Sequence, residues 1–321
     1  MDFDTGRVTG ETPAGLRPGE FVVDLDVASQ TYAVTTTCDF GSLRVVGVGT
    51  GPVTLVGSID MVLSDGADAW GVSSPTEHHP RGLLIPLAGG RRVQLPAGFY
   101  PQAGVSGVIV GILQRESEGT SPGSVLLIDA TTGTVRANLG TGWPVAAGNG
   151  LVVWAEACDA VSNKACTLHR MPVDGGRVTS YRLPRPAFAG LVSPDRRLVV
   201  LTLERPTQDA QFEGHPIAPN DIAILNLDTG RLAIVPGIEV PAKASPGLAF
   251  SADSRWLVIA LNAGSKTRLL AWRPGLAPGS PTPTSRSRSL GKPCNLRRSW
   301  SCPPAQAAEQ LSLATLLSGP G

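Results

Sequence analysis

Short apolar runs alternate with polar, turn-rich segments along most of the chain, and the clearest unit lies between Leu191 and Leu232. It contains a Ser-Pro-Asp turn, the apolar run Leu198 to Leu203, a polar insertion, the apolar run Asp221 to Leu227 and an Asp-Thr-Gly turn. Apolar runs of this length that are bounded by turn residues are typical of β-strands. We therefore interpret the unit as four short strands joined by turns.

The same unit recurs along the chain, and the glycine of the last turn marks each copy. A tight hairpin needs a residue that tolerates positive φ, which glycine does. The turn glycines are Gly6, Gly51, Gly90, Gly133, Gly176, Gly230 and Gly275. They follow one another at intervals of 39 to 54 residues, and the two central intervals are each 43 residues. This period predicts an all-β protein, a β-propeller of six to seven four-stranded blades.

The two ends of the chain depart from the repeat. Asp4 to Val8 matches the middle of a blade, so we expect the N-terminal blade to be incomplete. Either this strand completes the last blade and gives six blades, or the true start lies upstream and the parent has seven. After Gly275 the repeat stops, and the segment 281–298 is rich in Pro, Ser and Arg. We expect a propeller domain over 1–276 and a disordered tail over 277–321.

Two segments resemble a known blade signature. Leu191 to Val200 reads LVSPDRRLVV, and Leu248 to Val258 reads LAFSADSRWLV. Both are similar to the signature of TolB-like and WD-repeat-like propellers, in which an apolar pair precedes Ser-Pro-Asp-Gly, a basic residue and a strand. Here Arg196 and Ser254 occupy the place of the glycine. The resemblance implies a turn between the first two strands of a blade, in which the aspartate accepts backbone hydrogen bonds. It implies no activity.

Composition excludes several function classes. The chain is 42% hydrophobic and 17% charged, with 38 glycines and 28 prolines, which suits a large core and many turns. A net charge of +1 provides no field that would attract nucleic acid, so we predict no nucleic-acid partner. No apolar run is long enough for a transmembrane helix, and no signal peptide is recognisable. We expect a monomer.

Long polar insertions are predicted on one face of the propeller. Connections between the second and third strands of a blade share a face with those that lead to the next blade. Nearly all of the long insertions are of the first kind, and they cover Ser73 to Arg81, Arg115 to Gly123, Ala157 to Ala165 and Glu204 to Asn220. Loops on a rigid scaffold commonly carry function, so we predict that any ligand binds on this face.

Candidate binding residues come from these loops and from the connections between blades. The loops supply Glu77, His78, His79 and His215. Their carboxylate and imidazoles could form a metal or acid–base site, but the interpretation that we favour is a set of solvated polar loops. The connections supply four aromatic residues near the same face, Phe99, Tyr100, Trp143 and Phe188. We predict no metal and no cofactor.

Two cysteines flank one of the polar insertions. Cys158 and Cys166 lie at the mouth of a predicted hairpin, where a disulfide is geometrically feasible. Two free thiols are the alternative, and a zinc site that includes His169 lacks a fourth ligand. A disulfide would indicate an extracytoplasmic or membrane-anchored parent with an export signal upstream of Met1; otherwise the protein is cytoplasmic.

The function predicted from these observations is non-catalytic binding of a protein, a peptide or a small molecule on the face with the long loops. The alternative is a hydrolase or lyase with its site at the mouth of the central channel. Convergent histidine and carboxylate side chains there would favour the enzyme, whereas an aromatic patch around Tyr100 and Trp143 would favour binding.

Overall fold

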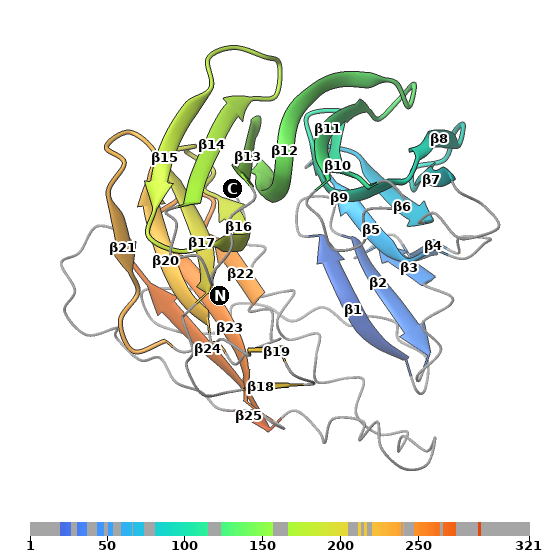
Figure 1. The fold of residues 1–321 in the computed structure, drawn as a ribbon. Helices are drawn as coiled ribbons and strands as arrows, with labels where there is room; N and C mark the ends of the chain where they lie inside the picture. Colours follow the sequence, from blue (N-terminus) through green and yellow to red (C-terminus); the bar gives the residue numbers. More distant parts are fainter. Residues whose placement is uncertain are drawn as a thin grey trace.

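The computed structural model describes residues 20–26, 31–36, 44–47, 51–53, 59–65, 67–73, 81–114, 123–156, 166–204, 211–212, 215–216, 220–238, 240, 247–263, 266–273 and 288–289. These residues form antiparallel sheets that follow one another in chain order. Figure 1 shows the sheets arranged around a common centre, from the N-terminal sheet in blue through green to the last sheet in orange.

The first two sheets each contain four consecutive strands. The first comprises β1 (Glu20–Asp26), β2 (Thr31–Thr36), β3 (Arg44–Gly47) and β4 (Gly51–Val53). The second comprises β5 (Met61–Ser64), β6 (Ala69–Ser73), β7 (Arg81–Pro86) and β8 (Val93–Ala97). In both sheets the spatial order of the strands is their order in the chain, which is the topology of a propeller blade.

The third and fourth blades are joined by one long strand. The third comprises β9 (Phe99–Val105), β10 (Val108–Leu113), β11 (Ser124–Asp129) and the first half of β12 (Val135–Gly148). The second half of β12 begins the fourth blade, which continues with β13 (Leu151–Glu156), β14 (Cys166–Pro172) and β15 (Thr179–Leu183). Because β12 pairs with β11 and then with β13, the two blades form a single seven-stranded sheet.

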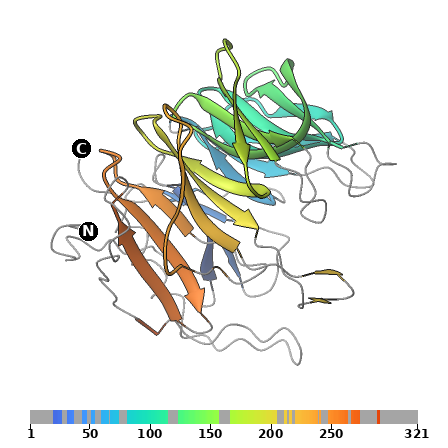
Figure 2. The same ribbon diagram turned by 60° about the vertical axis from the view of Figure 1, so that its left-hand side comes forward.

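The last two blades complete the described fold. The fifth comprises β16 (Ala187–Val192), β17 (Leu198–Glu204), β20 (Asn220–Asn226) and β21 (Leu232–Ile234). A small hairpin of β18 (Gln211–Phe212) and β19 (His215–Pro216) lies between β17 and β20 in the chain and projects away from the sheets in Figure 2. The sixth comprises β22 (Gly247–Phe250), β23 (Leu257–Ala263), β24 (Lys266–Trp272) and β25 (Arg288–Ser289).

The described strands thus form six blades, within the predicted range. The predicted strand at Asp4 to Val8 lies outside the described residues. Arg288 and Ser289 belong to the segment predicted as a disordered tail, yet they pair with Thr267 and Lys266 as the fourth strand of the last blade. The rest of the tail lies outside the described residues. No helix in the described part of the chain has the length and apolarity that crossing a membrane requires.

The first strand of each blade is the innermost. β1 contacts β5, β5 contacts β9, β9 and β16 contact β12, and β16 contacts β22. These strands approach closely, because a Cβ atom at Gly104 in β9 would lie 2.6 Å from the carbonyl oxygen of Ser64 in β5. The starts of these strands therefore surround one end of the central axis.

The hydrophobic core lies between neighbouring blades. Val199 and Leu201 of β17 pack against the fourth blade, whereas Val200 of the same strand packs against the sixth. Both faces of a middle strand are therefore covered, so these strands are apolar throughout instead of alternating. This explains the continuous apolar runs by which they were predicted.

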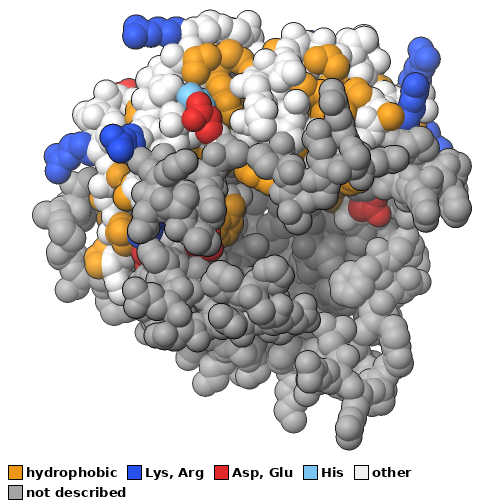
Figure 3. Space-filling model, viewed as in Figure 1, with side chains coloured by type: hydrophobic (Ala, Val, Ile, Leu, Met, Phe, Trp, Pro, Cys, Tyr) orange, Lys and Arg blue, Asp and Glu red, His pale blue; other side chains and the backbone are white. Residues whose placement is uncertain are grey.

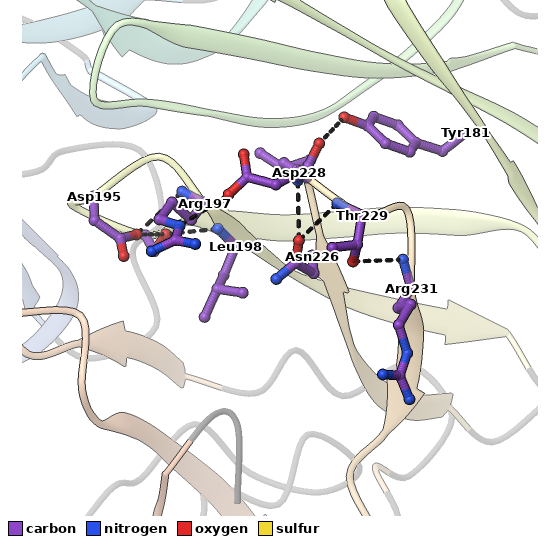
Figure 4. Close-up of polar contacts among 10 residues, drawn as sticks. Tyr181, Asp195, Arg197, Leu198, Asn226, Asp228, Thr229 and Arg231 are labelled. Carbon is purple, nitrogen blue, oxygen red and sulfur yellow. Dashed lines mark hydrogen bonds and ion pairs between the residues drawn. The ribbon is translucent and has the colours of Figure 1, made fainter.

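The turns between first and second strands have the predicted chemistry. In the fifth blade, Asp195 accepts hydrogen bonds from the Ser193 hydroxyl at 2.6 Å and from the Arg197 backbone N–H at 3.1 Å. In the sixth, Asp253 accepts equivalent bonds from Ser251 and Arg255. Figure 4 shows Asp195 in this turn near the Asp228 to Arg231 turn of the same blade.

Candidate functional site

Aromatic residues stand at the start of the innermost strand in three consecutive blades. Tyr100 is the second residue of β9, Trp143 is the second residue of the inner half of β12 (142–148), and Phe188 is the second residue of β16. Tyr100 is 41% exposed and Phe188 is 47% exposed, while Trp143 is partly buried. β12 contacts both β9 and β16, so the three residues belong to adjacent strands around the axis. We call Tyr100, Trp143 and Phe188 the aromatic mouth.

The aromatic mouth lies on the face from which the long loops leave. Tyr100 pairs with Ile112 and Trp143 pairs with Ala155, and in each case the second strand ends one residue later. Phe188 lies at a bulge opposite the end of β17, which also leads into a long insertion. The insertions connect the second and third strands of blades two to five, as predicted. The aromatic mouth is thus surrounded by the bases of these loops.

Local structure fixes where the inner strands begin. Gly98 alone connects β8 to β9, with a φ of +73° that favours glycine, and its carbonyl accepts a 3.0 Å bond from the Gln114 N–H. Before β16, the guanidinium of Arg185 forms a buried ion pair with Asp221 of β20, with an N–O distance of 2.7 Å. These contacts hold the chain immediately before Tyr100 and Phe188.

Five of the six inner strands carry no charge, whereas the sixth, β1, contains Glu20, Asp24 and Asp26. β5, β9, β16 and β22 and the inner half of β12, residues 142–148, contain no Asp, Glu, Lys or Arg. Besides the aromatic residues, they consist largely of small or aliphatic residues with one exposed amide, Gln102. An exposed aromatic surface without charges suits an apolar, neutral ligand.

The predicted location of the aromatic residues is partly wrong. Phe99, Tyr100, Trp143 and Phe188 were expected in connections between blades, but all four lie within strands. Phe99 is also fully buried and is not available to a ligand. β9 and the inner half of β12 were missed because Pro101 and Pro144 interrupt their patterns. An innermost strand has one edge free of strand partners, where a proline without an N–H costs no ladder hydrogen bond.

The remaining predicted binding residues lie where the structure describes no side chain, so their role stays a prediction. Glu77, His78 and His79 lie outside the described residues, in the connection between β6 and β7. His215 lies in β19, and its side chain is also outside the description. Within the described residues, no three His, Cys, Asp or Glu side chains are grouped so that they could hold a metal ion.

One polar cluster was not predicted from the sequence. Glu156, His169 and Ser180 come from three adjacent strands, β13, β14 and β15. His169 Nε2 lies 2.9 Å from Glu156 Oε1, and its Nδ1 lies 2.8 Å from Ser180 Oγ. A histidine beside an acidic side chain, next to hydrophobic side chains, is visible on the surface in Figure 3. The residues are 13 and 11 positions apart, so only strand pairing relates them.

Cys166 is fully buried at the start of β14 and is disulfide-bonded. Cys158, its predicted partner, lies outside the described residues, so the pairing remains a prediction.

Comparison with solved structures agrees with the fold. The chain is similar to a hydrazine synthase structure from Kuenenia stuttgartiensis, at 14% identity and a TM-score of 0.54 over 82% of this chain and 80% of that one. It is similar to a complex of KlAtg21 with the coiled coil of AgAtg16, at 10% identity and a TM-score of 0.50 over 81% and 82% of the two chains. TolB from Acinetobacter baumannii matches at 16% identity and a TM-score of 0.46, over 79% of this chain and 60% of TolB.

The chain is a β-propeller. The order of strands in its sheets, in which neighbours in the chain are neighbours in the blade, carries this assignment. No protein-family model matches the chain, and no curated protein matches its sequence. Sequence identities this low carry neither activity nor partner to this chain, so function has to be argued from its own residues.

Proposed function

We propose that the protein is a binding protein that holds a neutral, apolar peptide segment of a partner protein at the aromatic mouth. The observation that carries the proposal is the presence of aromatic side chains, two exposed and one partly buried, at corresponding ends of inner strands in three consecutive blades. Large exposed hydrophobic side chains that gather in one place are typical of interaction sites.

A peptide fits this arrangement better than a compact ligand. The three residues are distributed over three blades, so an extended chain can contact all of them with successive side chains. The strands that carry the aromatic mouth, β9, the inner half of β12 and β16, contain no charged residue that could pair with a charged group, and burial of an unpaired charge is costly. Aromatic rings that are held by packed strands lose little conformational entropy when a ligand binds, which favours affinity.

The experiment is a selection of displayed peptides on the full-length protein, followed by affinity measurement of selected peptides by titration calorimetry. We expect Tyr100→Ala and Phe188→Ala each to weaken binding by about tenfold, as loss of an aromatic contact at the centre of an interface does. Trp143 fluorescence should change on binding.

The matched controls are Val178→Ala and Ile234→Ala. These side chains are 45% and 47% exposed, but they lie beside or within the outermost strands β15 and β21. They should leave the affinity unchanged. If the controls weaken binding as much as Tyr100→Ala does, or if no selected peptide responds to Tyr100→Ala and Phe188→Ala, the aromatic mouth is not the binding site. Selected peptides that are charged would contradict the proposed ligand class.

A further inference from the structure

The Glu156–His169–Ser180 cluster has the connectivity of a hydrolase triad. A hydroxyl contacts an imidazole nitrogen at 2.8 Å, and the other nitrogen contacts a carboxylate at 2.9 Å. In the tautomer that carries its proton on Nε2, His169 donates to Glu156 and accepts from Ser180. A nucleophile that is bonded to a base, with the base oriented by a third group, is the arrangement that activates a serine.

Strand pairing holds the three side chains in place. Trp154 of β13, His169 of β14 and Ser180 of β15 are directly opposite one another in the sheet. Glu156 is two residues beyond Trp154, on the same face of β13. The indole of Trp154 stacks on the imidazole, with ring centroids 5.2 Å apart and an interplanar angle of 29°. The ring of His169 is therefore fixed by its stacking and by hydrogen bonds on both sides.

The solvent exposure of the three side chains fits a reactive serine, whose hydroxyl must be accessible to a substrate. Ser180 lies on the outermost strand of the fourth blade and is exposed, so a substrate can reach its hydroxyl. The His169 side chain is only 14% exposed, which restricts competition from water for its hydrogen bonds. The Glu156 side chain is 56% exposed, and within the cluster it contacts the imidazole of His169 and not the serine. It is therefore a positioning residue.

The surroundings indicate the class of substrate. Trp154 belongs to an apolar cluster between the third and fourth blades, against which Ala137 and Leu139 of β12 pack while partly exposed. An apolar acyl group has a surface to contact there. Arg182 is exposed two residues beyond Ser180 on the same face of β15, where its charge favours an oxyanion that develops near Ser180.

We propose that Ser180 is the nucleophile of a second site, one that hydrolyses carboxylic esters with short apolar acyl groups. This goes beyond the binding role of the aromatic mouth and does not depend on it. Ser180 Oγ attacks the ester carbonyl carbon, and its proton passes to His169 Nδ1. The C–O bond to the alcohol breaks, and His169 returns the proton to the leaving alkoxide. Water then attacks the acyl-serine through the same base, releasing the carboxylic acid and restoring Ser180.

The test uses a fluorophosphonate probe and p-nitrophenyl butyrate with the full-length protein. We expect the probe to modify Ser180, identified by peptide mass mapping, and to spare Ser106, which is exposed at the turn between β9 and β10. Release of p-nitrophenol should be lost in Ser180→Ala and slowed about a hundredfold in His169→Gln, because general-base assistance is removed. Labelling of Ser180 no faster than of Ser106, or hydrolysis that Ser180→Ala retains, would overturn the proposal.

The Glu156→Gln variant distinguishes a catalytic Glu156–His169–Ser180 cluster from a row of polar side chains that has only a structural role. The substituted side chain is largely exposed, so the fold should tolerate it, and thermal unfolding checks this. We expect slower labelling together with loss of the Nε2–H tautomer preference in nitrogen NMR of histidine-labelled protein. An unchanged labelling rate in a folded Glu156→Gln variant would contradict the role of Glu156. Should His169→Gln fail to fold, Ser180→Ala and Glu156→Gln still decide the question.

Discussion

At the residue scale, the blade signature shows how a turn tolerates unfavourable residues. Arg196 and Ser254 occupy the position of the signature glycine, and their φ angles are +61° and +59°. The left-handed conformation costs a non-glycine residue about 1–2 kcal/mol. The turn is nevertheless retained, because the hydrogen bonds to Asp195 and Asp253 fix the surrounding backbone.

Replacement of Arg196 by glycine should therefore stabilise the protein. We expect Arg196→Gly to raise the free energy of unfolding by up to about 1 kcal/mol, since relief of backbone strain exceeds the added flexibility of the unfolded chain. Ser254→Gly is the informative comparison, because its hydroxyl also accepts a 2.9 Å bond from the Asp195 N–H. Its gain should be smaller. Urea denaturation measures both, and a lower stability of Arg196→Gly would show that the arginine side chain contributes more than its conformation costs.

The lowered pKa of Asp129 predicts how the stability of the folded protein depends on pH. The Arg136 guanidinium, which bonds to its carboxylate, and two backbone N–H groups lower the pKa of Asp129 from 3.8 to about 2. A lowered folded pKa contributes stability that is fully present above about 3.8 and is lost as the pH falls toward about 2.

The measurement is denaturation of wild type and Asp129→Asn across this pH range. At neutral pH we expect the variant to be less stable by about 0.5–1 kcal/mol, as for a partly exposed ion pair. The difference should shrink as the pH falls, because only wild type loses its charge. Asp174→Asn, an exposed turn residue in the next blade, serves as the control. A difference that grows on acidification would contradict the assignment.

At the scale of elements, the middle strands and the inner strands β1, β5 and β22 could be predicted from the sequence, whereas β9, the inner half of β12 and β16 could not. β17 and β20 are covered on both faces, so their apolar runs are continuous and conspicuous. β9 and the inner half of β12 contain Pro101 and Pro144 and many small residues, a pattern that reads as a loop. The expectation that the aromatic residues lie on the face of the long loops came from the order of strands, which determines the face, and their role in binding stays a prediction. The Glu156–His169–Ser180 cluster was missed because it depends on register across three strands.

Contacts between elements of neighbouring blades are also testable. The Tyr181 hydroxyl of β15 donates a 2.6 Å hydrogen bond to the backbone carbonyl of Leu227, as Figure 4 shows, and so ties the fourth blade to the fifth. Burial raises the pKa of Tyr181 above 10.0, so the hydroxyl keeps its proton throughout the neutral range.

We expect Tyr181→Phe to lower the free energy of unfolding by about 1–2 kcal/mol, because the Leu227 carbonyl would lose its partner in a buried position. Tyr100→Phe is the matched control. The Tyr100 ring is 41% exposed, so removal of its hydroxyl should leave stability unchanged. Thermal unfolding of both variants gives the comparison, and equal effects would show that the Tyr181 bond contributes nothing specific.

At the scale of the whole molecule, the two ends of the propeller differ. At the end opposite the long loops, turns of successive blades are bonded to one another. Asp65 of the second blade accepts from the Gly107 N–H of the third, Asn149 of the fourth donates to the Val192 carbonyl of the fifth, and the Asp195 N–H of the fifth donates to Ser254 of the sixth. β12 joins the third and fourth blades covalently. One end is thus braced, which leaves the other available for loops that bind a ligand.

The disulfide of Cys166 belongs to the end of the propeller that carries the long loops. The predicted bridge to Cys158 closes the insertion between β13 and β14, next to Glu156, and so would restrain one of the loops around the aromatic mouth. Closing a loop of this length contributes about 2–3 kcal/mol to stability. A disulfide persists only in an oxidising compartment, so its presence in the native protein would also place the protein outside the reducing cytoplasm.

Thiol counting with peptide mapping tests this bridge. Of the five cysteines, at most three should react in the denatured, unreduced protein and all five after reduction. Mapping should recover one peptide pair that joins Cys158 and Cys166, and reduction should lower the unfolding temperature. A Cys166 linked to another cysteine would refute the predicted pairing, and five free thiols in protein purified under oxidising conditions would refute the bridge.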